Sequence, residues 1–388
     1  MPVDPARLRA GRIETPASAA EAAQVLKAAA GAGQTVLACG GGCFLDCGTP
    51  LHAPDVLLRT TALARTVFHE PKELVVRVQA GMTLAALQSL LATAGQEVPW
   101  DFPWPERQTV GGLLARGLAG PRRLGAGMPR DHVLGIEAVL ADGSVVRPGG
   151  RVVKNVAGYD LTRLFVGSGG RLGILTEATL RVTPLPEDAF AATAAFGSPA
   201  AAAGAVAAVL GAGLYPSFVE LKGRWGEYTV AAGIEGLRES VAAGREALLG
   251  VLRGGGQVTE LRGASVRVFL ADWTRGPWER PGFVARVSVP RSRLGAVLEA
   301  VEGPLVANAG NGVIRVAPGR ELAPVEAKDL LGRLHVLAVG LGGWAAQERG
   351  CLVGPAAEPG LSAGTRALAE RVRLDLDPGG CLGGGRRA

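Results

Sequence analysis

The sequence predicts an α+β protein of two parts, residues 1–186 and residues 187–388. Short apolar runs alternate with helical patterns along the chain, glycine turns gather in the first part, and the prolines at Pro184 and Pro186 mark a change of character. A length of 388 residues allows two or three domains, and 48% hydrophobic with 20% charged residues is typical of a globular fold.

The first part begins with a helix signal and continues mainly as strands. Ser18 and Glu21 have the spacing of a capping box, which predicts an alanine-rich helix that ends near Gly31 or Gly33. A second helix is expected at 84–94, before Gly95. Strands are expected at 35–38, 56–58, 74–78, 133–140, 145–146 and 174–182, with an Asp-Gly hairpin turn at 142–143.

The second part alternates strands with helices, which suggests a ferredoxin-like sheet with helices. Strands are expected at 190–196, 217–221, 228–234, 283–289 and 313–316, and helices at 200–210, 237–252 and 291–301. Residues 189–219 carry no charge and could span a bilayer by length. Alanine dominates them and Pro199 and Pro216 interrupt them, so a strand, a helix and a strand are expected. The glycine-rich tail, 375–388, shows no clear element.

Composition and motifs exclude several classes of protein. The net charge is +6, but the basic residues are scattered and aromatic residues make up 5%, which argues against nucleic-acid binding. There is no P-loop, and Leu172 takes the third glycine position of the nearest dinucleotide fingerprint. Ser362 lies in a Gly-x-Ser-x-Gly match, but the last histidine, His335, precedes it, so a hydrolase triad is not expected.

The cysteines and histidines do not predict a metal site. Five cysteines and the charged N-terminal sequence favour a cytoplasmic protein with reduced thiols. Cys39, Cys43 and Cys47 recur at every fourth residue, which thiolate ligands of a metal could do, but no fourth ligand is apparent. We expect them to pack around a glycine turn, with metal binding as the alternative. None of the four histidines lies at a metal-ligand spacing from another.

A set of glycine turns carries the positive signal. The Gly-Gly-Gly-Cys turn at 40–43 can offer successive backbone N–H groups to a pyrophosphate. Gly81 makes a tight turn after a strand, and Thr109 opens a probable helix whose free amides favour an anion. A glycine-rich turn at 167–173 then precedes a strand, where bare backbone can approach a ligand closely. Each turn alone is better explained as an ordinary turn, but the ordered set predicts a flavin dinucleotide site.

This order resembles the FAD-binding domain of the p-cresol methylhydroxylase (PCMH) and vanillyl-alcohol oxidase type. The shared pattern is a Gly-rich phosphate loop, an Ala-Gly turn, a Thr-Val-Gly-Gly helix start, an Asp-Gly hairpin and a Gly-rich turn before a strand. Within that type, the chain is similar to the FAD-domain subunits of bacterial glycolate oxidases. The segments that carry this likeness are 117–123, 130–131, 154–160 and, near the end, 376–379.

The resemblance implies a PCMH-type FAD-binding domain of two α+β subdomains in 1–186 and a ferredoxin-like α+β cap domain in 187–388. It implies an FAD-binding subunit of a glycolate oxidase complex that oxidises glycolate, a small 2-hydroxy acid, to glyoxylate. Its partners would be a second FAD-domain subunit and an iron–sulfur subunit, and the complex could contact a membrane peripherally. The alternatives are a scaffold subunit that has lost FAD and a stand-alone FAD oxidase.

The resemblance also implies site residues. The 40–43 turn would bind pyrophosphate, Thr109 and its glycines would lie along the dinucleotide, Ile174 would meet the adenine, and Lys154, Asn155 and Tyr159 would lie near the flavin. The expected cofactor-binding residues are Gly40, Gly41, Gly42, Cys43, Gly81, Thr109, Gly111, Gly112, Gly117, Asp131, Lys154, Asn155, Tyr159, Gly173 and Ile174.

The sequence departs from its relatives in places that bear on catalysis. Cys39 and Cys43 stand where relatives often carry Arg and Ser or Thr, which removes a hydroxyl contact but keeps the backbone donors. Related catalytic subunits carry clustered histidines in the second part, where this chain has only His335. No catalytic base is visible, so an accessory subunit is expected. Arg122 and Arg123 could neutralise a phosphate or contact a partner subunit.

Overall fold

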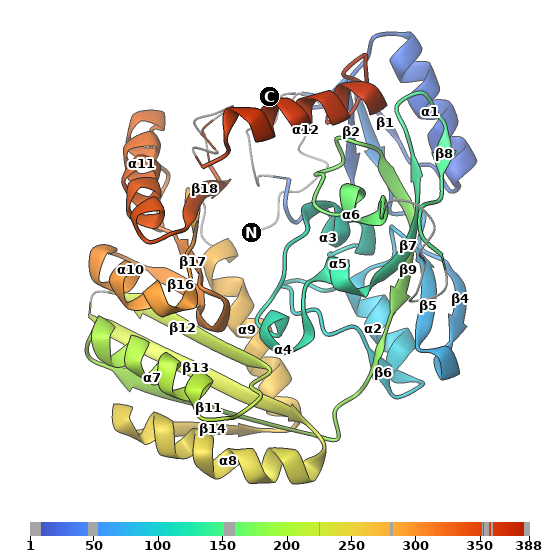
Figure 1. The fold of residues 1–388 in the computed structure, drawn as a ribbon. Coiled ribbons are helices and arrows are strands. Elements are labelled where there is room, and N and C mark those ends of the chain that lie inside the picture. The colour runs from blue at the N-terminus through green and yellow to red at the C-terminus, as the bar shows by residue number, and fades with distance from the viewer. Residues whose placement is uncertain are drawn as a thin grey trace.

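The computed structural model describes residues 9–45, 53–150, 160–224, 226–279, 282–350, 352, 357 and 360–383. The chain forms two lobes joined through α4, α9 and α12 (Figure 1). Lys154, Asn155 and Tyr159 lie outside the described residues, as does Cys47. No described helix is long and apolar enough to cross a membrane.

The first lobe contains two main sheets. A parallel sheet of order β1-β3-β2 is formed by β1 (Arg12–Glu14), β2 (Val36–Cys39) and β3 (Val56–Arg59), and α1 (Ala19–Gly31) packs against it. The second sheet has the order β4-β5-β9-β7-β8. Its strands are β4 (Thr66–Glu70), β5 (Val75–Gln79), β7 (Val133–Val139), β8 (Val145–Val146) and β9 (Ile174–Arg181).

Helices and a two-stranded ribbon complete the first lobe. The ribbon pairs β6 (Gln96–Glu97) with β10 (Thr183–Pro184). The helices are α2 (Leu84–Ala92), α3 (Val110–Arg116), α4 (Arg123–Ala126), α5 (Pro129–His132) and α6 (Thr162–Phe165). Ser18 caps α1 by accepting a hydrogen bond from the Glu21 amide, so the predicted capping box is confirmed.

The second lobe is one sheet of eight strands in the order β14-β11-β13-β12-β16-β17-β15-β18. The strands are β11 (Asp188–Phe196), β12 (Phe218–Arg224), β13 (Glu227–Gly236), β14 (Val258–Arg262), β15 (Val284–Ser288), β16 (Leu305–Asn308), β17 (Val313–Val316) and β18 (Trp344–Arg349). The helices are α7 (Pro199–Gly211), α8 (Arg238–Leu252), α9 (Ala264–Glu279), α10 (Leu294–Ala300) and α11 (Pro324–Gly340). The uncharged segment 189–219 is a strand, a helix and the start of a strand, as expected.

This sheet consists of two ferredoxin-like units joined edge to edge. The order of elements β11-α7-β12-β13-α8-β14 and the spatial order β14-β11-β13-β12 define the first unit. The second unit, β15-α10-β16-β17-α11-β18, repeats that arrangement in mirror order along the sheet. The units meet where β12 pairs with β16. The ferredoxin-like prediction is confirmed, and the structure adds a second copy that no sequence repeat revealed.

The two faces of the large sheet differ in chemistry. Alternate strand residues such as Leu221, Ile314 and Val287 are buried under α7, α8, α10 and α11 in one apolar core. On the other face, α9 covers the β11, β13 and β12 end through Val266, Leu270 and Trp273. The remaining part of that face is polar and lies toward the first lobe.

The end of the chain returns to the first lobe. Helix α12 (Ala363–Leu376) spans the space between the lobes (Figure 1), and its Val372 and Leu376 pack on the first-lobe core. Cys381 and Leu382 join the core beneath α1, and the Val36 amide donates to the Cys381 carbonyl at 2.7 Å. The expectation that 375–388 holds no element and belongs to the second part is therefore wrong for its described residues.

Candidate functional site

The predicted phosphate loop lies between β2 and the start of α3. Residues 37–45 line a cavity of ≈ 90 Å³ together with Gln108, Thr109, Arg116 and Gly169. Thr109 caps α3, and its Oγ1 accepts from the Gly112 amide at 3.2 Å. The structure thus brings Gly40, Gly41, Gly42, Cys43, Thr109 and Gly112 together around one cavity.

Glycine is required at two positions of this loop because the loop backbone packs closely against residues 107–109 of the same chain. A Cβ on Gly41 would overlap the Arg107 carbonyl oxygen, and a Cβ on Gly40 would overlap the Thr109 side chain. The Arg107 guanidinium also donates to the Gly41 carbonyl at 3.1 Å. These two glycines therefore hold the loop against the next segment, a role that the sequence analysis assigned to contact with a ligand.

Gln108 has an unused donor in this cavity. Its side chain is 2% exposed, and its Nε2 has no hydrogen-bond partner among the described residues. A buried amide without a partner is costly, so this donor fits a ligand that brings an acceptor oxygen. A dinucleotide pyrophosphate is such a ligand, and the residues present therefore fit the FAD that the motifs predict.

The cysteines beside the loop are packing residues of the turn. The Cys39 Sγ donates to the Gly40 carbonyl at 3.3 Å, and burial raises the pKa of its thiol to about 11 although Arg59 opposes this. The Cys43 Sγ donates to the Gly41 carbonyl at 3.8 Å. The part of the chain that the structure describes contains no group of three His, Cys, Asp or Glu that could hold a metal ion.

Several other predicted residues shape the lobe without lining the cavity. A Cβ on Gly81 would overlap the Thr60 carbonyl oxygen, and one on Gly111 would lie 2.8 Å from the Ala80 Cβ. Gly117 ends α3 with φ +60°, a backbone conformation that favours glycine. Gly173 packs beside Phe165, Ile174 is 2% exposed in the core under α1, and Asp131 accepts from the Met128 amide.

A second cavity, of ≈ 40 Å³, lies between the lobes. The first lobe contributes Phe44, Asp101–Pro103 and Leu118–Pro121, and the second contributes Glu220, Trp273, Thr274, Trp278, Val306, Asn308 and Arg315. Phe44 lines both cavities, so the phosphate loop leads toward the interlobe space. A bound dinucleotide that begins at the loop would therefore extend toward the polar face of the large sheet.

Two arginines lie on neighbouring strands of that polar face. The sheet register places Arg315 of β17 directly opposite Arg286 of β15, and the Arg286 Nε has no partner among the described residues. Arg315 pairs with Glu348 at 2.6 Å. Burial alone would raise the pKa of Glu348, but Arg315, Arg286 and Arg116 lower it. Like charges on directly opposed strand residues are destabilising, which favours an anion between them.

Arg123 extends this cationic cluster from the first lobe. Burial lowers the pKa of its guanidinium, and Arg286, Arg315 and Arg130 lower it further. Arg123 therefore faces arginines of the second lobe across the interface. An anionic group in this space would relieve their mutual repulsion. That Arg123 neutralises a phosphate or contacts a partner subunit stays a prediction.

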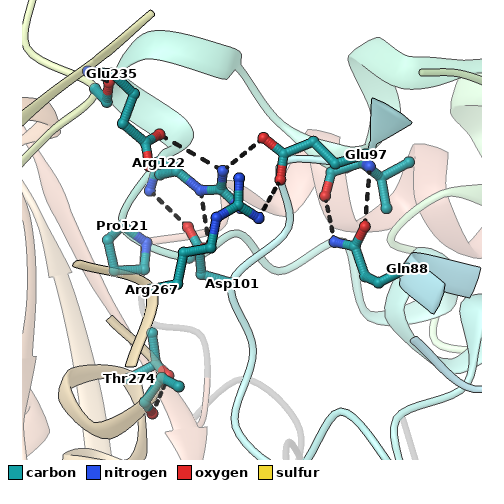
Figure 2. A network of polar contacts seen from close by, with 12 residues as sticks. Gln88, Glu97, Asp101, Pro121, Arg122, Glu235, Arg267 and Thr274 are labelled. Atoms are coloured by element: carbon teal, nitrogen blue, oxygen red, sulfur yellow. Dashed lines mark hydrogen bonds and ion pairs between the residues drawn. The ribbon is translucent and has the colours of Figure 1, made fainter. Parts of the chain in front are cut away.

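Arg122 instead belongs to an internal charge network that joins the lobes (Figure 2). Its side chain is 5% exposed and contacts Glu97 and Asp101, both at 2.9 Å, and Glu235 of β13 at 3.5 Å. Arg267 of α9 approaches the other Glu97 oxygen at 2.9 Å. The expectation that Arg122 meets a phosphate or partner is therefore wrong, because buried carboxylates occupy its guanidinium.

Sequence reasoning missed Gln108, Glu220 and Arg286. Gln108 directly precedes the Thr-Val-Gly-Gly motif, and its position could have been noticed. Glu220 is the first charged residue after the long uncharged segment and lies in an apolar strand, which is an unusual place for a carboxylate. Nothing in the sequence near Arg286 indicates that β15 and β17 are neighbours.

Comparison with known proteins agrees with this geometry. Residues 11–149 match the family model described as "FAD binding domain". The chain is 48% identical over 121 residues to glycolate oxidase subunit GlcE of Escherichia coli (strain K12), covering 31% of this chain and 35% of that protein. It is 38% identical over 151 residues to glycolate oxidase subunit GlcD of Bacillus subtilis (strain 168), covering 39% and 32%.

Other comparisons cover different shares of the chain. A D-lactate dehydrogenase of Archaeoglobus fulgidus is 35% identical over 173 residues, covering 45% of this chain and 39% of that protein. These matches span less than half the length of the relatives. The solved structure of an alkyldihydroxyacetonephosphate synthase has a TM-score of 0.71 at 16% identity, covering 97% of this chain and 76% of that one, which shows a shared fold. Residues 11–149 therefore form an FAD-binding domain, and the cofactor of this chain is FAD.

Proposed function

We propose that this chain is the FAD-binding subunit of a glycolate oxidase complex that oxidises a small 2-hydroxy acid, with glycolate giving glyoxylate. The observation that carries the proposal is the cationic sheet face at the end of the path from the phosphate loop. The shared lining residue Phe44 connects the loop cavity to the interlobe cavity, where Arg315 stands. A carboxylate substrate is negatively charged and would bind to the arginines of this face.

Different residues of this chain would bind the cofactor and the substrate. The backbone amides of 40–43, the Gln108 Nε2 and the start of α3 would bind the FAD pyrophosphate. The bound flavin would accept two electrons and a hydrogen from the substrate. Arg286 and Arg123 would hold the substrate carboxylate, and Phe44, Phe102 and Trp278 would exclude water from the cavity. Asp131, Ile174, Lys154, Asn155 and Tyr159 stay predicted cofactor residues.

The complex and its location are part of the proposal. Similarity to proteins named as glycolate oxidase subunits supports a second FAD-domain subunit as partner. An iron–sulfur subunit, which would take the electrons onward, and peripheral contact with a membrane rest on the family resemblance. A cytoplasmic location is inferred from the reduced thiols. A stand-alone FAD oxidase is the second candidate function, favoured by the buried carboxylic acid of Glu220 in the interlobe cavity.

A visible absorption spectrum tests the proposal first. The chain is purified alone and then together with the two other subunits, and glycolate or D-lactate is added without oxygen. Flavin bands near one per chain that bleach on addition are expected. A chain that joins the complex but adds no flavin would instead support the scaffold that has lost FAD.

A further inference from the structure

Glu220 is held rigidly at the interlobe cavity. The side chain lies on β12, is 3% exposed and lines the cavity with Asn308 and Trp273. Its Oε1 accepts from the Asn308 Nδ2 at 2.7 Å, and its Oε2 accepts from the Trp273 Nε1 at 3.2 Å. The same Asn308 amide donates to the Pro121 carbonyl of the first lobe at 3.3 Å. The carboxyl group is therefore fixed beside the loop 118–121.

Glu220 differs from the other charged residues of this cavity because it has no cation at ion-pair distance among the described residues. Asp101 is paired with Arg122 at 2.9 Å, and Arg315 is paired with Glu348. Burial raises the pKa of Glu220 to about 8, with Asp101 adding to the rise and Arg315 opposing it. Lys222, two residues along β12, also faces it across a longer distance.

The described histidines have other environments. His69 contacts Gln96 at 2.9 Å, and His132 contacts the Met128 carbonyl at 3.1 Å inside the first lobe. His335 lies on α11 near Gly360. Among the described residues that line the interlobe cavity there is no histidine. Oxidation of a 2-hydroxy acid needs an acceptor for the hydroxyl proton, and this cavity offers a carboxyl group in that place.

We propose that Glu220 is the catalytic base that accepts the hydroxyl proton of the substrate. This role rests on the proposed function. The C–H hydrogen leaves the substrate carbon with its electron pair and goes to the flavin, the O–H bond breaks, and its electron pair forms the C=O bond. The proton passes to the Glu220 carboxylate. Substrate dehydrogenation then belongs to this chain itself, in contrast to the accessory role that the sequence predicts.

The test uses the flavin-loaded chain in complex with its partner subunits. Glu220→Gln keeps the size of the side chain and removes the base, and Glu227→Gln, at an exposed position of the neighbouring β13, is the matched control. Both variants should retain FAD and its visible spectrum. Flavin reduction by glycolate, followed by stopped flow at pH 8.5, should be about 100-fold or more slower in Glu220→Gln and unchanged in the control.

A binding measurement provides a second readout. Oxalate has no hydroxyl hydrogen to transfer and carries negative charge, so the wild-type chain should bind it more weakly as Glu220 ionises. We expect the oxalate dissociation constant, from flavin difference spectra, to rise with a midpoint near pH 8 in the wild type and to be flat in Glu220→Gln. If Glu220→Gln does not fold, the rate of flavin reduction in the wild type between pH 6 and 9 tests the role of Glu220 instead. That rate should rise with a midpoint near pH 8.

The outcomes separate this role from the proposed function. A Glu220→Gln chain that is reduced at the wild-type rate overturns the role of Glu220 and leaves the function standing. A wild-type reduction rate without an inflection between pH 7 and 9 has the same consequence. A flavin-loaded wild-type complex that no 2-hydroxy acid reduces overturns the proposed function, and the role of Glu220 with it.

Discussion

At the scale of single residues, Gln108 links the folded structure to the cofactor. Its side chain is buried beside the phosphate loop, and its Nε2 has no hydrogen-bond partner within the described chain. Folding alone does not explain a buried amide in this state. Cofactor binding does, because it supplies the missing acceptor.

Gln108→Glu is therefore expected to weaken FAD binding. The substitution keeps the shape of the side chain but replaces a donor by an acceptor that repels phosphate oxygens, so the FAD dissociation constant should rise about 10-fold or more. Fluorescence titration of the apoprotein with FAD measures it. Gln257→Glu, at an exposed position, is the control and should have no effect. Equal affinity in both variants would place the pyrophosphate elsewhere.

Glu220 predicts a pH dependence of stability. Its pKa is raised from 4.5 to about 8 in the folded chain, so the folded state holds the proton more tightly than the unfolded state. This contribution to the free energy of unfolding is fully present below pH 4.5 and is lost as pH rises from 4.5 through 8, by up to about 5 kcal/mol. Urea unfolding of wild type and Glu220→Gln from pH 5 to 9 should show a steeper decline in the wild type. Parallel curves would contradict the shift.

At the scale of elements, the residues after α12 show what the predicted 376–379 motif does. Asp377 is fully buried, and its two carboxylate oxygens accept from the Cys381 and Leu382 amides at 2.8 Å and 2.7 Å. The carboxylate thus ends the helix and turns the chain into the edge of the β2 sheet, where Leu382 pairs with Val36.

Asp377→Ala is expected to lower the free energy of unfolding by roughly 2 kcal/mol, because two charge-assisted hydrogen bonds are lost and two amides stay buried. Asp375→Ala, exposed on the preceding turn, is the control and should change stability by less than about 0.5 kcal/mol. Urea denaturation compares them. A loss confined to the control would contradict the proposed turn.

The elements that the sequence predicted are those whose signals are local. The Ser18 cap, the Thr109 helix start and the alternating runs of β9 and β11 each act within a few residues. Among the strands that were missed, β1, β6 and β10 are two or three residues long and exist only through pairing with distant partners. The longer strands β4, β14, β16 and β18 were missed as well. Helices α9 and α12 were missed because their apolar residues complete cores formed elsewhere in the chain.

The residues of the candidate site also differ in whether local sequence could predict them. The glycines of the phosphate loop were predicted because their run is visible in the sequence, although Gly40 and Gly41 are required by contact with Thr109 and Arg107. Arg286, Arg315 and Arg123 could not be grouped, because they come together only when two ferredoxin-like units share a sheet and face the first lobe. The place of Glu220 at the interlobe cavity depends on the same packing of the lobes. Lys154, Asn155 and Tyr159 stay predictions, since they lie outside the described residues.

At the scale of the whole molecule, the Arg122 network connects the two lobes (Figure 2). Glu97 and Asp101 come from the first lobe, and Glu235 and Arg267 come from the second. Arg122 is the cation that all three carboxylates share, and Arg267 adds a second cation at Glu97. Burial raises the pKa of Glu235 even so. Loss of that cation would leave uncompensated buried charge.

Arg122→Met is therefore expected to destabilise the chain by on the order of 3–5 kcal/mol and to loosen the interface between the lobes. Urea unfolding gives the first quantity, and amide hydrogen exchange in the 118–121 loop reports the second. Arg293→Met, at an exposed position, serves as control. Arg122→Lys should rescue only in part, because an ammonium cannot reach three carboxylates as a planar guanidinium does. Unchanged exchange would show that the network does not hold the lobes.

The return of α12 and Leu382 to the first lobe has a consequence for how this gene can be rearranged. The second lobe is inserted into the first, because the chain before it and the chain after it both belong to the first lobe. An exchange of the second lobe by recombination or in an engineered chimaera therefore needs two junctions, one near residue 186 and one near residue 362. A chimaera with a single junction would also replace the C-terminal residues, including Leu382, which pairs with Val36 at the edge of the first-lobe sheet. Cap exchange between relatives should therefore preserve the sequence on both flanks together.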